Sequence, residues 1–447
     1  MGRRRRRSKK LDADPVQAHI ESLSHEGRGI THIDDKVVFI SGALADEDVM
    51  FRYTATRRNY DDGAVVEVLK ASPDRVEPAC EYFNICGGCS MQHMDTDKQI
   101  IMKQEVLLNQ FQRTSQIEPQ NVLPPLTSAH WGYRTKARLG VRYVAKKERA
   151  LVGFREKQNS YLADMHSCEV LDPRVGHKLD NISDCIGKLE ARDKVAQIEV
   201  AITEDVVGLV FRNLVELSDA DKQLLIDLAK TENFHIYLQP AGPDSVQLLY
   251  PQSSTLKYAL PDFGVELQFL PLDFTQVNTG INQQMIKQAM KLLEPGPEDN
   301  VLDLFCGLGN FSLPIATLAG KVTAVEGDAG LIDRARENAQ RNNLDNVEFH
   351  VQDLTEDLTN ADWAKQTFTK ILIDPARPGA LEMMEVVAKM APERIVYVSC
   401  NPATLARDAG ELVNKYGYTL VNAGVMDMFP HTAHVESMAL FKKVGSH

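Results

Sequence analysis

The sequence lacks a long hydrophobic run. None of its stretches approaches the roughly 18 to 20 consecutive apolar residues that a helix needs to cross a bilayer. Arginines and lysines follow the first two residues, and no apolar segment of the kind found in secretory signals comes after them. We therefore expect a cytoplasmic protein that contacts no membrane.

The sequence also lacks an excess of positive charge. Its 62 acidic residues outnumber its 50 basic residues, and the formal net charge is −12 at pH 7. A protein of this charge has no general attraction for nucleic acids, so any such contact must depend on local basic clusters. The first cluster lies at the N-terminus, where residues 3–7 are all arginine. Residues 1–14 are predicted to form a disordered basic arm, which either binds phosphates or is a solvated tail.

The second basic cluster runs from Trp131 to Lys157. Aromatic and basic side chains are interleaved in it, and only Glu148 and Glu156 carry negative charge. Cations that bind phosphates and aromatic rings that stack on bases are what the recognition of unpaired RNA requires. The same alternation also suits the solvated face of a β-sheet. The basic members are Arg134, Lys136, Arg138, Arg142, Lys146, Lys147, Arg149, Arg155 and Lys157, and the aromatic members are Trp131, Tyr133, Tyr143 and Phe154.

Four of the seven cysteines form a pattern that suggests a metal centre. In a reducing compartment, cysteines indicate metal binding or catalysis before disulfides. Cys80, Cys86 and Cys89 lie within ten residues, and Cys168 follows far along the chain. This spacing favours an iron–sulfur cluster, in which the last ligand can be remote. Structural zinc is the alternative, although its cysteines more often come as two close pairs. Four unrelated buried cysteines are the remaining possibility.

The N-terminal half divides into two predicted domains. Residues 15–74 contain short strands separated by turn residues, which is typical of a small β-barrel. Their amino-acid sequence resembles the TRAM domain. That resemblance implies an RNA-binding accessory module. Residues 75–270 read as a mainly antiparallel α+β domain that contains the cysteines. A helix over 97–113 is expected to pack in the core, with the C-terminal domain as its candidate partner.

The C-terminal part, residues 271–447, alternates regularly between strands and helices. A short loop joins the last two strands, so the final strand should run antiparallel. This is the seven-stranded, Rossmann-like architecture of class I methyltransferases that use S-adenosyl-L-methionine. The predicted strands are 301–305, 321–325, 347–351, 371–373, 395–398, 420–425 and 437–441.

A glycine-rich turn after the first of these strands is the candidate cofactor loop. Gly307 and Gly309 allow close approach of backbone N–H groups to a ligand. Glu326 ends the second strand, where an acid binds ribose hydroxyls. Asp353, after the third strand, is expected to reach the adenine. A dinucleotide-binding loop would have a third glycine where this sequence has Ser312, which weakens that alternative.

A thiol and two carboxylates are predicted to meet at one edge of the sheet. Asp374 and Cys400 each follow a short apolar strand, and Glu436 lies between the last two strands, at the same edge of the sheet as Cys400. Carboxyl ends of parallel strands share an edge, where ligands bind. Uracil C5 becomes nucleophilic when a thiolate adds to C6, and a base must later remove the C5 proton. Cys400 and Glu436 are the candidates for these roles. The plainer alternative for Cys400 is a buried packing residue.

The segments Asp374–Gly379, Ser399–Thr404 and Asp427–Glu436 together resemble the signatures of the RNA uracil-C5 methyltransferases. The added barrel and cysteine set resemble members that act on 23S rRNA. The resemblance implies methylation of a uridine there, expected to be uridine 1939, by a chain that we expect to be a monomer. It implies the following residues: Cys400 as nucleophile, Glu436 as base, Cys80, Cys86, Cys89 and Cys168 as [4Fe-4S] ligands, and Gln276, Phe305, Asn310, Glu326, Asp353 and Asp374 in the pocket for cofactor and base.

Several alternatives stay open at this stage. Methylation of exocyclic amines uses an aromatic residue after Asp-Pro, whereas this sequence has Arg377 nearby. Cytosine-C5 methyltransferases have a second cysteine beside Asp374, which is missing here. An inert RNA-binding protein with a redox-sensing cluster is a different class. For Gln276, the alternative role is a cap for the helix that follows it. His431 and His434 are expected to brace their loop rather than to bind a metal.

Overall fold

The computed structural model describes residues 14–356, 358 and 361–445. The described chain forms two compact units. The first comprises the residues up to 83, 88–103 and 430–434, and the second comprises the remainder. Apart from Asp14, the predicted basic arm lies outside the described residues. No helix in the described ranges combines the length and apolar character needed to cross a membrane.

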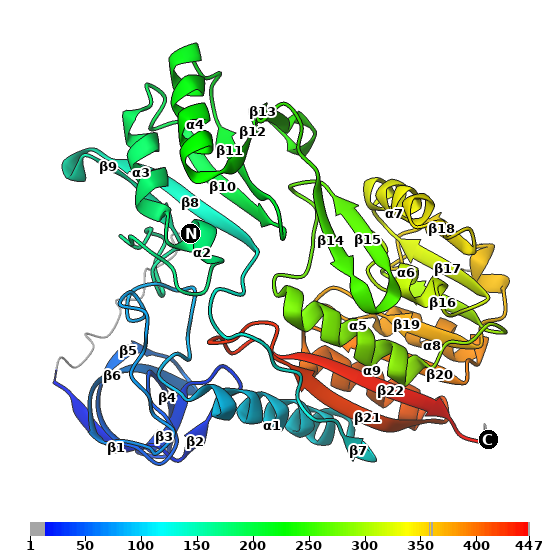
Figure 1. The fold of residues 1–447 in the computed structure, drawn as a ribbon. Helices are drawn as coiled ribbons and strands as arrows, with labels where there is room; N and C mark the ends of the chain where they lie inside the picture. The colour runs from blue at the N-terminus through cyan, green and yellow to red at the C-terminus, as the bar shows by residue number, and fades with distance from the viewer. Residues whose placement is uncertain (1–13, 357, 359–360, 446–447) are drawn as a thin grey trace, which may run out of the picture. The chain divides into compact units, whose positions relative to one another are not determined.

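The first unit contains a six-stranded sheet in the order β1-β5-β6-β4-β3-β2 (Figure 1). Its strands are β1 (Val16–His19), β2 (Ser22–Leu23), β3 (Gly29–Ile33), β4 (Lys36–Ser41), β5 (Asp48–Thr56) and β6 (Tyr60–Lys70). The two edge strands, β1 and β2, are consecutive in the chain and are separated only by Ile20 and Glu21. The closure of this sheet into a barrel stays a prediction. Ile20, Val38 and Phe51 are completely buried inside it. Gly63 is required there, because a Cβ would lie 2.6 Å from the Phe51 ring.

Helix α1 (Thr96–Ser115) confirms the helix predicted over 97–113. Its last residue is bound to helix α9 (Pro402–Asn414). The Ser115 hydroxyl donates to the Ala406 carbonyl at 2.7 Å, and the Asn414 amide donates to the Ser115 carbonyl at 3.1 Å. The expected packing on the C-terminal part of the chain is therefore present at this end of the helix.

The central part of the second unit is built on a sheet in the order β13-β12-β11-β10-β8-β9. The strands are β8 (Lys136–Val144), β9 (Arg149–Gly153), β10 (Val195–Ile202), β11 (Val207–Asn213), β12 (Phe234–Leu238) and β13 (Gln247–Tyr250). All pairings are antiparallel except β11 with β12, which are joined by α4 (Asp219–Glu232). The prediction of a mainly antiparallel sheet is confirmed.

Two helices of this region were not predicted from the sequence. The structure adds the short α2 (Pro173–Gly176) and α3 (Leu179–Lys188), and Figure 1 shows α3 and α4 on the same face of the sheet. Helix α3 has only ten residues, and Leu179, Ile182 and Ile186 are its only large apolar side chains that are buried. Such a short helix depends on its packing against β9, which the sequence pattern does not reveal.

A separate hairpin connects the central sheet to the C-terminal part. It consists of β14 (Leu256–Leu260) and β15 (Val265–Phe269), which pair antiparallel. The backbone of Gln268 exchanges two hydrogen bonds with the amide of Asn338 in α7 (Ala329–Arg341), at 2.9 and 3.0 Å. The hairpin therefore packs on the C-terminal sheet layer. The predicted domain boundaries, including the one after residue 270, stay predictions.

The C-terminal sheet has the order β18-β17-β16-β19-β20-β22-β21-β7. The seven predicted strands are all present: β16 (Asn300–Leu304), β17 (Lys321–Glu326), β18 (Val347–Val351), β19 (Lys370–Ile373), β20 (Arg394–Ser399), β21 (Tyr418–Met426) and β22 (Glu436–Lys443). Strand β22 lies antiparallel between β20 and β21, as expected for the final hairpin. The expected total of seven is wrong, because the two-residue β7 (Asn121–Val122) adds an eighth strand parallel to β21.

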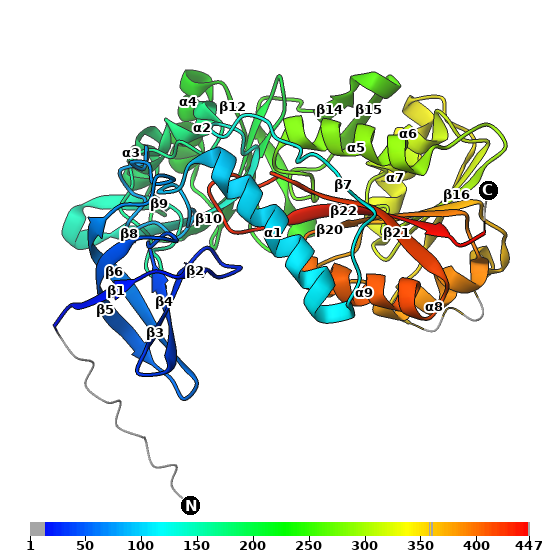
Figure 2. The same ribbon diagram turned by 90° about the horizontal axis from the view of Figure 1, so that it is seen from below.

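Helices cover both faces of this sheet. Figure 2 shows α5 (Thr279–Leu293) on one face, and α8 (Leu381–Met390) and α9 on the other. The short α6 (Ser312–Ala316) follows β16. Strands β16, β19 and β20 are parallel neighbours at the centre of the sheet. Their carboxyl ends lie at one edge, where an open α/β sheet binds its ligands.

A buried tyrosine connects β20 to α9 and can be tested by mutation. The Tyr397 hydroxyl donates to the carboxylate of Asp408 at 2.7 Å, and neither residue is exposed. We expect Tyr397→Phe to lower the free energy of unfolding by about 1–3 kcal/mol, because a buried carboxylate loses a hydrogen bond. Tyr418→Phe is the control, since that hydroxyl donates to the neutral Pro392 carbonyl at 3.0 Å. Denaturant unfolding measures both. Equal losses would contradict the special role of Asp408.

Candidate active site

The turn after β16 has the backbone shape of a ligand-binding loop. Phe305, Gly307 and Gly309 all have positive φ angles, of 65°, 55° and 98°. A phenylalanine in the left-handed region is strained, and such strain clusters at functional sites. The carboxylate of Glu326, at the end of β17, accepts from the Gly307 N–H at 3.1 Å. The two predicted cofactor residues Phe305 and Glu326 therefore belong to one locally constrained structure.

Asn310 closes this turn and is held by two neighbours. Its Oδ1 accepts from the Tyr258 hydroxyl at 2.9 Å and from Asn282 Nδ2 at 3.2 Å. Its Nδ2 donates to Asn282 Oδ1 at 2.9 Å. Tyr258 lies on the hairpin and Asn282 on α5, so elements on either side of the loop orient the Asn310 amide. One Nδ2 proton is left over for a ligand. Sequence reasoning missed Tyr258 and Asn282, which no motif marks.

Gln276 lies in the loop between β15 and α5. It lines a small pocket with Thr135, Tyr258 and Asn282, among others. The N-terminal cap of α5 is not Gln276 but Asn278, whose Oδ1 accepts from the Ile281 N–H at 3.2 Å. The alternative role of Gln276 as a helix cap is therefore wrong, and its position in the pocket agrees with a binding role.

Asp353 occupies an exposed turn after β18. Its carboxylate accepts from the N–H and the hydroxyl of Thr355, at 2.9 and 2.7 Å, and these hydrogen bonds hold the pKa of Asp353 below its usual range. The neighbouring Gln352 N–H donates to the Glu326 carbonyl at 2.9 Å, so the turn begins beside the end of β17. The role of Asp353 at the adenine stays a prediction.

Two carboxylates lie at or beside the ends of β16 and β19: Asp303 is completely buried and Asp374 is partly buried. Burial raises the pKa of Asp374 to about 7. Asp303 is completely buried, and burial raises its pKa to about 7 even though the Ser312 hydroxyl donates to it at 2.5 Å. The charges of Asp374 and Glu326 act on Asp303 in the same direction as burial. A cationic ligand at this edge would meet a local concentration of negative charge. The sequence motif contains Asp303, but only the structure shows its burial.

Cys400 and Glu436 come together through the register of β20 and β22. Ser399 pairs with Ser437, and each predicted catalytic residue is the next one along its strand. Burial raises the pKa of the Cys400 thiol to about 11, and the charges of Glu436 and Asp374 act in the same direction, whereas Arg377 opposes them. The structure therefore brings Cys400, Glu436 and Asp374 close together, and the roles of Cys400 as nucleophile and Glu436 as base stay predictions. At neutral pH the thiol is protonated in the absence of substrate.

The loop after β19 is fixed to the loop that carries Cys400. The Arg377 carbonyl accepts from Asn401 Nδ2 at 3.1 Å and from the Thr404 hydroxyl at 3.3 Å. Gly379 has φ 81°, and a Cβ there would lie 2.7 Å from Arg407 and Asp408 side-chain atoms. The two sequence signatures thus form one hydrogen-bonded structure around the thiol.

The four predicted cluster ligands are distributed over the two units. Cys80 and Cys89 belong to the first unit, and Cys86 and Cys168 belong to the second. All four are outside disulfides, so their thiols are the donor set that an iron–sulfur cluster needs. Within either unit of the described chain, no three Cys, His, Asp or Glu side chains are assembled to hold a metal ion. The ligand set stays a prediction.

The loop at residues 430–434 is braced by its own unit. The His431 N–H donates to Gln99 Oε1 at 2.9 Å, and the His431 carbonyl accepts from the N–H groups of Ser90 and Met91 at 2.9 and 3.0 Å. These contacts agree with the structural role that we expected for His431.

The basic cluster from 131 to 157 includes strand β8, in which exposed and buried residues alternate. The Arg138 side chain is 72% exposed although it forms an ion pair with Glu199. Arg142 is also exposed. Arg134 lies 5.9 Å from the centre of the Phe154 ring and 6.0 Å from that of Phe429. The cluster thus has an exposed, cationic strand face, and its binding to RNA stays a prediction.

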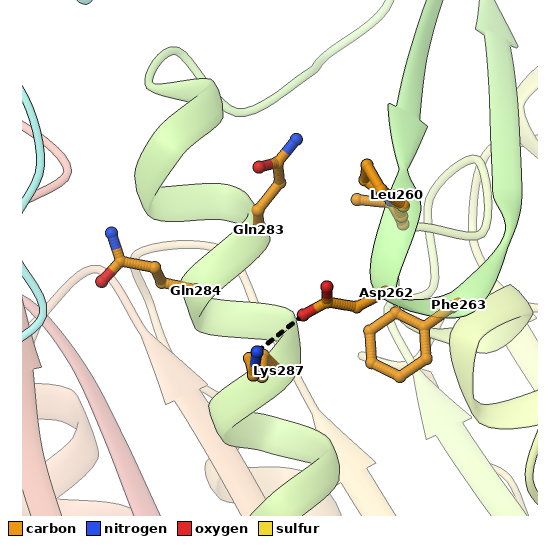
Figure 3. A pocket seen from close by; sticks show the side chains of 7 residues that line it. Leu260, Asp262, Phe263, Gln283, Gln284 and Lys287 are labelled. Carbon is orange, nitrogen blue, oxygen red and sulfur yellow. Dashed lines mark ion pairs between the residues drawn. The ribbon is translucent and has the colours of Figure 1, made fainter.

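A further pocket lies between the β14–β15 hairpin and α5 (Figure 3). Leu260 and Phe263 form its apolar wall. An ion pair of 2.9 Å joins Asp262 on the hairpin to Lys287 on α5. No predicted site residue lines this pocket.

Comparison with known proteins identifies the class to which this fold and site belong. A model of the family described as tRNA (Uracil-5-)-methyltransferase matches residues 96–444. The chain therefore belongs to this family of RNA uracil-C5 methyltransferases. A crystal structure of the Pyrococcus abyssi tRNA (uracil-54, C5)-methyltransferase with S-adenosyl-L-homocysteine has the same fold, with a TM-score of 0.73 and 22% identity, and covers 95% of this chain and 100% of that one.

Within the family, the chain is similar over its whole length to proteins named RlmD, 23S rRNA (uracil(1939)-C(5))-methyltransferase. The protein from Methylococcus capsulatus is 52% identical over 444 residues, which cover 99% of this chain and 100% of the relative. The protein from Alcanivorax borkumensis is 51% identical over 441 residues, which cover 98% and 99%.

The electrostatic link between Cys400 and Glu436 predicts the reactivity of the thiol. We expect alkylation of Cys400 by iodoacetamide to be slow at pH 7.5 and to accelerate as the pH rises toward about 11, because the thiolate is the reactive form. Glu436→Gln removes a negative charge, lowers the pKa of Cys400 and should accelerate alkylation several-fold at pH 8. Mass spectrometry of the Cys400 peptide measures the rate.

Glu385→Gln is the control for this experiment, because Glu385 is exposed on α8, where it pairs with Lys389. Its rate should equal that of the wild type. A Glu436→Gln rate equal to that of the control would show that Glu436 does not act on the thiol.

Proposed function

We propose that this chain transfers a methyl group from S-adenosyl-L-methionine to C5 of a uridine in 23S rRNA, at the position corresponding to uridine 1939. The observation that carries the proposal is the meeting of Cys400, Glu436 and Asp374 at the edge of the sheet beside the cofactor loop. The full-length similarity to RlmD proteins, which their names assign to this uridine, supports the choice of substrate.

Cys400 acts as the nucleophile. Its thiol loses its proton to solvent as the sulfur bonds to C6 of the uracil, and electron density moves to C5, which can then attack the methyl group. The negative charges near Cys400 keep the thiol protonated until the substrate is present, which protects it from side reactions. The target base must leave its stack to reach this edge of the sheet.

Glu436 acts as the base. After methylation, C5 carries both its original proton and the new methyl group. Removal of that proton restores the C5–C6 double bond and expels the Cys400 thiolate, which completes the turnover. The register of β20 and β22 holds Glu436 beside Cys400 throughout.

The cofactor pocket is assigned to Gln276, Phe305, Asn310, Glu326, Asp353 and Asp374. S-adenosyl-L-methionine supplies a methyl group on a positively charged sulfur. The carboxylates Asp303 and Asp374 favour binding of this sulfonium cation over binding of the thioether product, whose sulfur is uncharged. The Asn310 amide is oriented to donate its remaining proton to an anionic group.

The N-terminal half is assigned to RNA binding and to the iron–sulfur cluster. The barrel acts as a TRAM-like module, and the exposed face of β8 offers cations to phosphates. Cys80, Cys86, Cys89 and Cys168 would hold a [4Fe-4S] cluster, which supplies a structural brace or an electron-transfer centre. The protein acts as a cytoplasmic monomer.

An adduct-trapping experiment tests the reaction. Glu436→Gln, mixed with a 23S rRNA fragment that contains the target uridine and with S-adenosyl-L-methionine, should form a protein–RNA adduct that survives denaturation, because the C5 proton cannot leave. The band should be absent with Cys400→Ala, and Glu385→Gln should turn over like the wild type. Failure of the wild type to methylate, together with no adduct, would overturn the enzyme assignment in favour of an inert RNA-binding protein.

Iron analysis tests the cluster. Protein purified without oxygen should be brown and contain about four irons per chain. Cys168→Ser should lose colour and iron, whereas Cys185→Ser should keep both, because Cys185 is a buried cysteine of α3 outside the predicted set. Colourless protein with one zinc per chain would contradict the cluster.

A further inference from the structure

Lys136, at the start of β8, directs its ammonium group toward the loop 270–278, which carries Gln276. Its Nζ donates to the carbonyl of Pro271 and lies 6.0 Å from the centre of the Phe269 ring. Burial lowers the pKa of Lys136 to about 8, although the charges of Glu199 and Asp273 oppose this effect. A partly buried ammonium loses part of its hydration, so its hydrogen-bond partner matters. The Pro271 carbonyl is that partner.

The segment that Lys136 contacts is the loop 270–278, which carries Gln276. The residue before Lys136 holds the other end of this loop. The N–H and the hydroxyl of Thr135 both donate to the Val277 carbonyl, at 2.9 and 3.1 Å. Two consecutive residues of the central sheet therefore hold the loop on either side of Gln276.

The interior of the loop is fixed from the opposite layer. Asp273 accepts from the Leu270 N–H at 2.7 Å and forms an ion pair of 2.6 Å with Arg334 on α7. The carbonyl of Pro271, one residue after Leu270, accepts the hydrogen bond from Lys136 Nζ. Thr135 itself lines the same pocket as Gln276. The hydrogen bonds of Thr135 and Lys136 thus determine where Gln276 stands in the pocket.

The geometry distinguishes Lys136 from the other cations of β8. Arg138, two residues further along the same face, has a side chain that is 72% exposed, as a ligand of RNA phosphates should be. The Lys136 ammonium is instead engaged by a loop carbonyl. Lys136 was grouped with the RNA-binding cluster on its sequence position alone, and its contacts place it with the cofactor site.

We propose that Lys136 is a positioning residue for the cofactor: its bond to the Pro271 carbonyl holds the loop that presents Gln276, and it thereby strengthens binding of S-adenosyl-L-methionine. The proposal rests on the methyltransferase function and adds a residue that touches neither the cofactor nor the base. It also makes β8 a direct link between the RNA-facing sheet and the cofactor pocket.

The test is Lys136→Met, which keeps the length of the side chain and removes the charge and the donor. We expect the Kd for S-adenosyl-L-homocysteine, measured by calorimetry, and the KM for S-adenosyl-L-methionine to rise about tenfold, as for the loss of a hydrogen bond from a charged group. The kcat and the affinity for the rRNA fragment should stay within about twofold of wild type. The Tm should be unchanged or higher, because a buried charge is removed.

Arg138→Gln is the matched control on the same strand face. It should weaken binding of the rRNA fragment and leave the Kd for S-adenosyl-L-homocysteine unchanged. If Lys136→Met behaves like this control, or if its Kd for S-adenosyl-L-homocysteine stays within twofold of wild type, the proposal is wrong.

Thr135→Val provides a second variant in case Lys136→Met does not fold. It removes the hydroxyl donor to Val277 and keeps the N–H donor, so binding of S-adenosyl-L-homocysteine should weaken about threefold, and an unchanged Kd would again overturn the proposal. Wild-type protein that neither binds this ligand nor methylates the rRNA fragment would instead disprove the function itself. The two failures are therefore distinguishable.

Discussion

The active site depends on the meeting of buried negative charge with a thiol at the carboxyl ends of three parallel strands. Strands β16, β19 and β20 are neighbours, and Asp303, Asp374 and Cys400 lie at or beside their ends. Burial raises the pKa of all three groups, because each would have to carry its charge with little water nearby. Under the proposed function, a cationic cofactor would meet these groups at this edge. The same edge of the sheet therefore provides both binding and control of reactivity.

The cofactor pocket is assembled from parts that are distant in sequence. The turn after β16 is constrained from inside by the bond between Gly307 and Glu326, and from outside by Tyr258 and Asn282 through Asn310. The loop carrying Gln276 is held from the central sheet by Thr135 and Lys136. Residues outside the predicted cofactor set thus hold Asn310 and the loop of Gln276 in place, and side chains held in advance bind a ligand at a lower entropic cost.

The central sheet combines two tasks on one strand. The start of β8 contacts the loop 270–278, which carries Gln276. The later residues of β8 expose cations such as Arg138 and Arg142. This arrangement fits an enzyme that must place an RNA base and a small cofactor at the same carbon atom.

The candidate catalytic residues could be selected from the sequence because they lie within short motifs at strand ends, and the regular strand–helix alternation predicts which ends share an edge. Their catalytic roles stay predictions. Asp374, Cys400 and Glu436 are of this kind, as are the positions of the seven main strands. The sequence did not reveal β7 or α3, since elements this short are stable only through packing. Only the tertiary structure shows that Asn278 caps α5 and that Lys136 donates to the Pro271 carbonyl. These contacts depend on which atoms come close in the folded chain. Local pattern determines the chemistry that the chain carries, whereas long-range contacts determine which polar groups are buried and how they are held.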